Sequence, residues 1–518
     1  MKKRYPVFVS LLLCAGFCFA KKNAVPAGPF QSGRVLEKMS SLPMATAEIS
    51  DFMPEKNLVF VVGGEKVLEI VDLKNPAFPK KVAEVRVPGN ASSVSVHGDL
   101  VAVSLIDDEA WKDGQVQVMR YTDSLEVLGL FRVCSQPDMI KWTPDGRNLL
   151  VACEGSPSDD FVEDPEGGIA ILSVPDASSA ESWVNPELNV VRFDNLDTAS
   201  LKAAGVRAPG TQGFVRSLEP EYITISEDSR TAWVSLQENN AIAKLDVQAK
   251  RVSRVFPLGY VDHSKPGFGL DAVSDKEIRI VNYPLRGLRQ PDGIASFSLG
   301  GKNYVLTANE GAPVNDYKAW TDETTPVMLA QQEVLDRYVF RDALLKELSN
   351  MTVSGMEHCT RSPDKTPNGK CPYAYSFGSR SVSLFDGSDG KLLWDSGELF
   401  ERMVARLAPD YFNWNSKKGK VKMDSRSPDK GCEPENLTVG IVNHRRYVFV
   451  GLERTAGIAV FDMTNLDAPV LVDFLIDPLD RGPEGILFIP ADKSPLAGQA
   501  LLIVGFEFSK SLTIYMVK

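Results

Sequence analysis

Histidine and cysteine are scarce in this chain. Its 518 residues include 4 histidines and 7 cysteines, and no CxxC pair or Cys/His cluster has the spacing of a zinc site. The sequence also lacks a GxSxG elbow, and no recognisable motif places a histidine near a serine or cysteine. These absences argue against a zinc enzyme and against a hydrolase that uses a serine or cysteine nucleophile.

Long apolar runs are absent after the first twenty residues, so we expect no membrane span. Residues 1–20 begin with Lys2, Lys3 and Arg4, continue as a short apolar run and end at Ala20, which is typical of a secretory signal peptide. We predict a flexible segment over residues 21–33 and an exported protein, periplasmic or secreted.

Basic residues are fewer than acidic residues in this chain. The chain has 57 Lys and Arg against 68 Asp and Glu, a formal net charge of −11, and loss of the signal peptide lowers it to −14 because three positive charges leave. A protein of this charge repels nucleic acid and attracts cations, and no run is basic enough to reverse that. We therefore predict no nucleic-acid partner. Separately, we expect a monomer.

Five cysteines remain after the signal peptide, so at least one thiol is free or pairs between chains. Cys359 and Cys371 flank a loop rich in Pro, Lys and Gly, and we favour a disulfide between them. Cys134 and Cys153 end two strands of one hairpin and are a second candidate pair. Cys432 is left over.

A repeated strand–turn–strand unit runs through the whole chain. Its clearest copy has a strand from Pro137, a Pro-Asp-Gly turn at residues 144–146 and a second apolar strand over 148–152. Six diverged copies begin near Ala47, Ser92, Glu219, Gln290, Glu433 and Gly482. One such unit cannot bury both of its faces, so the units must pack against one another. We predict an all-β, seven-bladed β-propeller over residues 34–518, which fits seven copies better than a sandwich or solenoid.

Two further features refine this architecture. The last copy has three obvious strands, and residues 34–42 are placed to supply its fourth, which would close the ring. Residues 311–374 form an insertion in the fifth blade, and Val327–Leu348 has apolar residues at helical spacing. The insertion is either a lid or partner surface, or decoration of the ring.

Carboxylates recur at two equivalent positions of the repeat. The residue that opens the first strand is Glu48, Ser93, Asp138, Glu221, Asp292, Glu435 and Glu484 in turn. The residue that follows the second strand is Glu65, Asp107, Glu154, Gln237, Glu310, Glu453 and Glu507. Antiparallel strands place the start of one beside the end of the next. The pattern therefore predicts two acidic tiers at one mouth of a central channel.

Carboxylates this dense need compensation, since two like charges about 4 Å apart repel by roughly 4 kcal/mol near a protein surface. Ion pairs between blades are one solution, because Arg86, Arg132, Arg216, Arg289, Arg426 and Arg481 precede six of the copies. Bound calcium is the other, because its preferred ligands are hard oxygens. The candidate metal ligands are Glu48, Asp138, Glu154, Glu221, Asp292, Glu310, Glu435, Glu453, Glu484 and Glu507.

A loop of mixed charge, residues 424–431, comes just before Glu435. Together with Arg380 in the string at 376–381, it offers an anionic ligand, or a phosphate bridged by a cation, several charged partners. The candidate ligand-binding residues are Arg380, Asp424, Arg426, Asp429 and Lys430. The alternative is a loop whose Asp and Ser side chains hold its own backbone.

Several strings carry a family resemblance. Residues 290–295 (QPDGIA), 307–311 (TANEG), 376–381 (SFGSRS), 424–431 (DSRSPDKG) and 451–455 (GLERT) resemble those of the choice-of-anchor I family. The resemblance implies a propeller domain of exported and surface proteins, some of whose members are phosphatase-like and others cell-surface glycoproteins. No sortase motif or hydrophobic tail follows the last copy, so we expect a free protein.

Two functions follow from these patterns. The first is a binding module whose acidic, calcium-binding mouth holds a surface glycan, a peptide or a protein partner. The alternative is a metal-dependent phosphoesterase similar to alkaline phosphatases or phytases, in which carboxylates hold ions that activate water. The fold does not decide between the two functions, because propellers serve both roles. The missing catalytic signature favours binding.

Overall fold

A computed structural model describes residues 34–518, apart from residues 175, 178, 211–212, 316–319, 358 and 360–364. The predicted signal peptide, residues 1–20, and the segment 21–33 lie outside the described residues. The described part consists of short strands with a few short helices, so the all-β prediction is confirmed. None of its helices combines the length and the apolar character that crossing a bilayer requires.

Seven four-stranded antiparallel sheets follow one another along the described chain. Each is numbered here in chain order, and its strands are given from the innermost outward. They are sheet 1, β2 (Ile49–Met53), β3 (Leu58–Val62), β4 (Val67–Asp72) and β5 (Lys80–Arg86); sheet 2, β6 (Asn90–His97), β7 (Leu100–Ile106), β8 (Asp113–Tyr121) and β9 (Leu125–Ser135); sheet 3, β10 (Pro137–Trp142), β11 (Asn148–Cys153), β12 (Gly168–Ser173) and β13 (Glu187–Val191); sheet 4, β14 (Pro220–Ile225), β15 (Thr231–Leu236), β16 (Ala241–Asp246) and β17 (Arg251–Pro257); sheet 5, β20 (Ile294–Leu299), β21 (Lys302–Asn309), β25 (Ser381–Asp386) and β26 (Leu392–Asp395); sheet 6, β27 (Pro434–Val442), β28 (Arg445–Leu452), β29 (Gly457–Asp462) and β30 (Val470–Ile476); and sheet 7, β31 (Pro483–Ile489), β32 (Ala500–Phe506), β33 (Ser511–Val517) and β1 (Leu36–Pro43).

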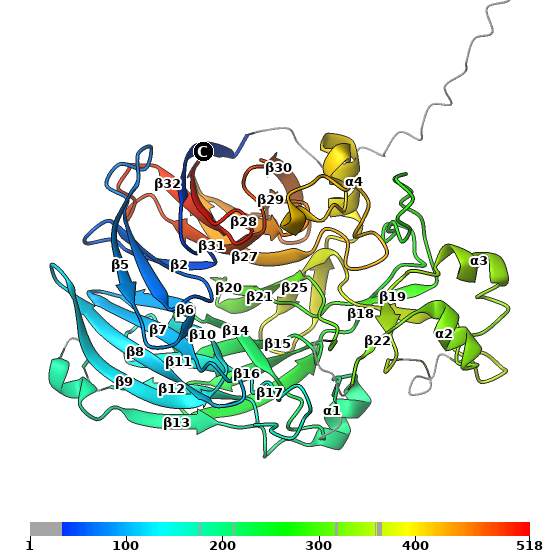
Figure 1. Ribbon diagram of the computed structural model, residues 1–518, viewed down its shortest axis with the longest axis horizontal. Coiled ribbons are helices and arrows are strands. Elements are labelled where there is room, and N and C mark those ends of the chain that lie inside the picture. Colours follow the sequence, from blue (N-terminus) through cyan, green and yellow to red (C-terminus); the bar gives the residue numbers. More distant parts are fainter. Residues whose placement is uncertain are drawn as a thin grey trace, which may run out of the picture.

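The first strands of the sheets surround a common centre (Figure 1). β2 contacts β6, and the contacts continue through β10, β14, β20, β27 and β31, which in turn contacts β2. The second strands are buried on both faces, as in β3, where all five residues of Leu58–Val62 are buried. The runs of Val, Leu, Ile and Ala in these strands follow from that position, because each sheet packs against a neighbour on either side.

The strand predicted near residues 34–42 is β1. It pairs antiparallel with β33, so that Leu36 lies opposite Val517 and Pro43 opposite Ser511. Its N-terminal end is held from sheet 6, where Asp473 Oδ2 accepts the backbone N–H groups of Val35 at 2.7 Å and of Leu36 at 3.0 Å. The segment therefore joins the last sheet rather than the sheet that follows it in sequence.

The helical spacing over Val327–Leu348 corresponds to helix at its two ends and not to one continuous helix. Two short helices, α2 (Pro326–Gln331) and α3 (Asp342–Glu347), flank a non-helical stretch. Cys371 donates its N–H to the carbonyl of Val334, and the carbonyl of Cys371 accepts the N–H of Asp336. Backbone groups of this stretch that a helix would pair internally are therefore already bonded to Cys371. The insertion also contains β22 (Glu323–Thr324) and β23 (Val353–Ser354).

Other elements lie outside the seven sheets. A three-stranded sheet joins β18 (Tyr260–Asp262), β19 (Leu285–Leu288) and β24 (Ala374–Ser376). The helices α1 (Thr198–Ala204) and α4 (Leu399–Leu407) were missed by the sequence analysis, and α4 packs its buried face, including Phe400 and Val404, on the core between sheets 5 and 6.

Both proposed disulfides are present. Cys134 is bonded to Cys153, and Cys359 to Cys371. Cys432 is a buried free thiol. The first bond joins the end of β9 to the end of β11, and the second ties the insertion to the segment that leads into β24.

Candidate functional site

A repeated backbone geometry precedes the first strand in four of the sheets. Gln136, Gln290 and Glu433 have left-handed φ angles of 46°, 43° and 51°, and glycine occupies the equivalent position at Gly482, with a φ of 69°. Each of the three non-glycine residues stands directly before a proline, and Glu433 begins a Glu-Pro-Glu string. A left-handed residue before an extended proline turns the chain sharply into the innermost strand.

This turn is tied to the end of the second strand. Glu154 donates its N–H to the carbonyl of Gln136 at 3.0 Å, and Glu453 does the same to Glu433 at 2.8 Å. In sheet 7, Glu507 donates to the carbonyl of Gly482 at 2.8 Å. In these three sheets the hydrogen bonds hold the two predicted acidic positions at the same end of the innermost strand.

Carboxylates from three sheets meet there. One ligand oxygen from each of Asp292, Glu435 and Glu484 lies within 4.8 Å of the others, and the same holds for Glu310, Glu435 and Glu453. Glu435 therefore belongs to both triads. The Oε2 atoms of Glu435 and Glu221 are buried, and no N–H or O–H donor of the described residues bonds them. Such oxygens are costly to bury unless they are protonated or bind a cation.

Burial raises the pKa values of most of these carboxyl groups. Burial and the charge of Glu238 raise the pKa of Asp138 to about 6, and burial together with Glu238 and Asp138 raises that of Glu154 to about 8. Burial and Glu310 raise the pKa of Asp292 to about 8. The pKa values of Glu221, Glu435, Glu453 and Glu484 lie well above the ordinary value, for burial first and neighbouring carboxylates second.

Three basic side chains stand together beside sheet 6, and we call them the basic cluster: Arg426, Lys430 and Arg454. All three contact the fully buried carboxylate of Glu433, with N···O distances of 2.6 Å from Arg426, 3.3 Å from Lys430 and 3.1 Å from Arg454. Although burial opposes it, their charge lowers the pKa of Glu433 to about 2. Lys430 also pairs with Glu310, so its ammonium group lies among the acidic residues.

Among the described residues, no such basic cluster stands beside the carboxylates of sheets 3 and 4. The sheet 4 side comprises Asp138, Glu154, Glu219, Glu221 and Glu238. Burial and the charges of Glu238 and Glu154 raise the pKa values of Glu219 and Glu221 well above the ordinary value. Arg207 only partly offsets the raised pKa of Glu238, because its guanidinium pairs with Asp322 and donates to the backbone carbonyl of Glu238 at 2.7 Å.

Glu48 and Glu507 complete the mouth between sheets 1 and 7. Burial and the charges of Glu507 and Asp138 raise the pKa of Glu48 to about 7, against the opposing effect of Lys510. A cavity of about 280 Å³ is lined by Glu48, Glu65, Glu507 and Lys510 among others, so there is space for water or an ion at this point.

Of the five predicted ligand-binding residues, Arg380 is internal. Its guanidinium is buried, pairs with Glu401 of α4, and donates to the backbone carbonyls of Ser427 at 2.6 Å and Asp429 at 2.7 Å. It therefore holds the 424–431 loop from inside. Asp424 is also buried, and its Oδ2 accepts the N–H groups of Asp275 at 2.8 Å and Lys276 at 2.7 Å.

The other three ligand candidates lie closer to the mouth. Arg426 pairs with Asp429 at 2.5 Å and with Glu433, and Lys430 pairs with Glu310 and Glu433. The loop thus satisfies most of its own charges, as the alternative interpretation held. Its contribution to the mouth is the ammonium group of Lys430.

Most of the arginines that precede the copies do not reach the carboxylates. Arg132 pairs with Asp113 on the surface at 3.0 Å, and Arg289 pairs with Asp395 within sheet 5 at 3.1 Å. Arg426 is the exception. The second tier is also incomplete on sheets 1 and 2, where Glu65 and Asp107 are exposed.

Sequence reasoning missed Glu219, Glu238, Glu433 and Arg454. The signal for two of them was present, because Glu219 and Glu433 are the first residues of the two Glu-Pro-Glu strings. Glu238 follows Gln237, the one uncharged member of the second tier, and takes its place in the acidic group. Gln237 itself donates from Nε2 to Glu310 at 2.8 Å.

Comparison with known families supports the family resemblance of the sequence motifs. Residues 48–466 match the choice-of-anchor I domain. The chain belongs to this family. Among curated relatives of the choice-of-anchor I chain, a mesenchyme-specific cell surface glycoprotein of Strongylocentrotus purpuratus is 29% identical over 327 residues, which are 56% of this chain and 42% of that protein. Gigasin-3a of Magallana gigas is 27% identical over 197 residues, or 34% of this chain and 66% of the relative. The chain thus spans less than two thirds of the length of either relative.

Among solved structures, the chain is similar to hydrazine synthase of Kuenenia stuttgartiensis, with a TM-score of 0.46 and 12% identity over 93% of this chain and 98% of that one. It is also similar to the β-propeller domain of Cps50 (Swd1) from Myceliophteria thermophila, with a TM-score of 0.46 and 9% identity over 93% of this chain and all of that one.

Proposed function

We propose that this protein is an exported, seven-bladed β-propeller whose acidic mouth binds divalent cations, calcium first, and through them a surface glycan, a peptide or a protein partner. Each of the seven sheets would be one blade. The cycle of contacts among the innermost strands and the pairing of β1 with β33 support a closed ring. Membership of the choice-of-anchor family, and a relative named for the cell surface, support an exported location, periplasmic or secreted.

The observation that carries the cation proposal is the pair of carboxylate triads that share Glu435. Calcium takes six to eight oxygen ligands, and the two triads together bring five carboxyl groups into one region. Burial and neighbouring carboxylates raise the pKa values of four of them, Asp292, Glu435, Glu453 and Glu484, which favours protons that a bound ion would replace.

The phosphoesterase alternative finds no support of this kind. Clamping a phosphate requires arginine or lysine groups that are free to turn toward it. Arg380 and Arg426 are both engaged by internal carboxylates and carbonyls. We therefore favour a binding module over a catalyst.

Calcium titration of the purified protein by isothermal calorimetry tests the proposal. We expect saturable binding with proton release, because the ion displaces protons from carboxyl groups whose pKa values are raised. Glu435→Gln removes a ligand from both triads and should weaken binding at least tenfold. Glu484→Gln removes one ligand from a single triad and should weaken it less.

Glu126→Gln is the matched control, because Glu126 is an exposed glutamate on β9, away from the mouth. It should bind calcium as the parent protein does. Equal calcium binding by the parent protein and Glu435→Gln would refute the site. Chelator-sensitive release of phosphate from an ester panel would instead support the enzyme.

A further inference from the structure

The other end of the innermost strands forms a pocket of different character. Its volume is about 600 Å³, and its walls come from sheets 1, 2, 3 and 7. Asp138 opens β10 at the acidic mouth, whereas Lys141, three residues and about 10 Å further along the strand, lines this pocket. The pocket and the acidic mouth therefore lie at opposite ends of the same strands.

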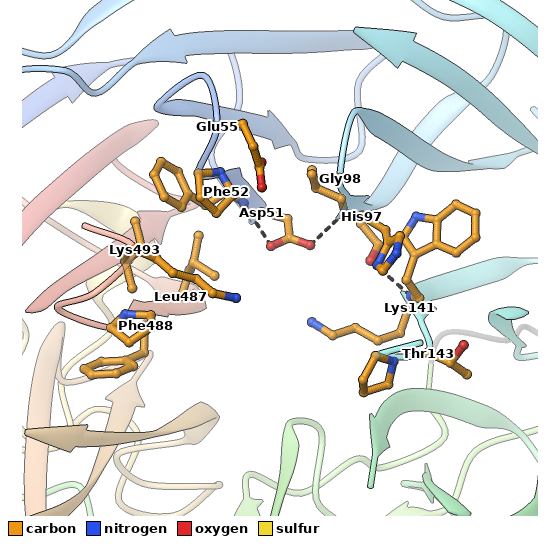
Figure 2. A pocket seen from close by; sticks show the side chains of 17 residues that line it. Asp51, Phe52, Glu55, His97, Gly98, Lys141, Thr143, Leu487, Phe488 and Lys493 are labelled. Carbon is orange, nitrogen blue, oxygen red and sulfur yellow. Dashed lines mark hydrogen bonds between the residues drawn. The ribbon is translucent and has the colours of Figure 1, made fainter. Parts of the chain in front are cut away.

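Two ammonium groups dominate the pocket. Figure 2 shows the side chains of Lys141 and Lys493 extending toward one another across it. Within the described part of the chain, neither ammonium group has a hydrogen bond or ion pair. Like charges that face each other without a direct ion-pair partner repel, and an anion placed between them would relieve that repulsion.

Among the described residues, neither carboxylate of the pocket forms an ion pair with these lysines. Asp51 is held by the backbone, since its two oxygens accept the N–H groups of Phe52 at 2.9 Å and Val96 at 2.8 Å (Figure 2). The bond from Val96 ties sheet 1 to sheet 2. Glu55 is exposed at the rim.

Aromatic groups make up much of the remaining wall. Phe488 stacks on Phe449 with ring centroids 5.8 Å apart, and His97 lies 5.9 Å from Trp142. The indole N–H of Trp142 is buried, and no hydrogen-bond acceptor of the described residues bonds it. The wall thus offers fixed apolar surface.

We propose that this pocket binds a small organic carboxylate with an aromatic or apolar body. The carboxylate would bridge Lys141 and Lys493, and the body would cover Phe52, Leu487 and Phe488. The volume is within the range of small-molecule sites. A compact inorganic anion would satisfy the lysines but leave the aromatic wall in water, so the walls favour the organic class.

A panel of aromatic and aliphatic carboxylates, titrated by calorimetry at low salt without added divalent cations, tests this proposal. We expect at least one aromatic carboxylate to bind, and its neutral amide and inorganic sulfate to bind at least tenfold more weakly. The double variant Lys141→Met/Lys493→Met should weaken carboxylate binding at least tenfold, whereas Lys141→Arg should retain it.

Lys302→Met is the matched control, because Lys302 is an exposed lysine at the start of β21 in sheet 5 and does not line the pocket. It should bind as the parent protein does. Failure of the whole panel to bind, equal binding by the folded double variant, or sulfate binding as tight as that of the best carboxylate would overturn the proposal. Circular dichroism of each variant separates loss of binding from loss of fold.

Discussion

Glu219 and Glu433 occupy the same place in two sheets, and their chemistry is opposite. Each is the first residue of a Glu-Pro-Glu string that leads into an innermost strand. The three groups of the basic cluster lower the pKa of Glu433 to about 2, whereas burial and neighbouring carboxylates raise the pKa of Glu219 well above its ordinary value. Position in the repeat fixes where a carboxyl group lies, and the neighbouring loops decide whether it is charged.

The largest expected effect comes from removing Glu433. Glu433→Ala leaves Arg426, Lys430 and Arg454 facing one another without the buried carboxylate that they share, and an uncompensated buried charge typically costs about 3–5 kcal/mol. Urea unfolding at pH 7 measures the change in the free energy of unfolding. Glu219→Ala is the matched control and should cost far less, because it removes a group that other carboxylates already disfavour. Equal losses would contradict the comparison.

Removal of the disulfide between sheets 2 and 3 should rank second. Cys134→Ala/Cys153→Ala opens a loop with a sequence separation of 19, and such a bond contributes about 3 kcal/mol. Cys153 directly precedes Glu154, so we also expect weaker calcium binding in this variant. The Cys359–Cys371 pair lies in the insertion, and its removal should leave calcium binding unchanged, as measured by calorimetry. A loss of calcium affinity in both variants would contradict this assignment.

The dependence of stability on pH should distinguish the carboxyl groups whose pKa values are raised from Glu433, whose pKa is lowered. Groups whose folded pKa is raised hold protons that the unfolded chain releases, so the free energy of unfolding should fall as pH rises from about 5 to 8, by up to about 1.4 kcal/mol per pH unit for each group. The window follows from pKa values of about 6 for Asp138, 7 for Glu48 and 8 for Glu154 and Asp292.

Calcium at saturating concentration should flatten that slope, because the bound ion favours the ionised carboxylates. Glu433 acts in the opposite sense: its lowered pKa stabilises the fold above the unfolded value, and that contribution is lost as pH falls from about 4 toward 2. Urea unfolding between pH 3 and 9, with and without calcium, measures both effects. A stability that rises steadily from pH 5 to 8 without calcium would refute the account.

Lys430 should compete with calcium. Its ammonium group pairs with Glu310, a member of one carboxylate triad, so it stands where a cation would bind. Lys430→Met should tighten calcium binding by about tenfold, a change of about 1.4 kcal/mol, while it lowers stability in the absence of calcium. Lys430→Arg keeps the charge and should bind calcium as weakly as the parent protein. Weaker calcium binding by Lys430→Met than by the parent protein would contradict competition between Lys430 and calcium.

The smallest effect should come from an exposed pair. Arg132 contacts Asp113 at 3.0 Å, but both side chains are open to solvent. Arg132→Ala should change the free energy of unfolding by less than about 0.5 kcal/mol in urea titrations, because surface ion pairs contribute little. A loss comparable to that of Glu433→Ala would show that exposure does not govern the strength of these pairs.

The sequence predicted the strand repeat, both disulfides and the gathering of Asp292, Glu435 and Glu484, because each depends on local pattern. It did not predict which carboxylates are compensated. That outcome depends on loops such as 424–431, which fold back from distant positions to place Lys430 beside Glu310. The interrupted helix at 327–348 has the same origin, since the backbone of Cys371 takes the hydrogen bonds that helical periodicity assigned to the segment itself.

The pairing of β1 with β33 sets the order in which the protein can mature. Leu36 emerges from the ribosome early, yet its partner Val517 is made after every other strand described here. Until then β32 offers a bare edge to proteases and to other nascent chains, and the N-terminal strand has nowhere to dock. A delay in translation or translocation near residue 500 should therefore be more hazardous than the same delay near residue 250.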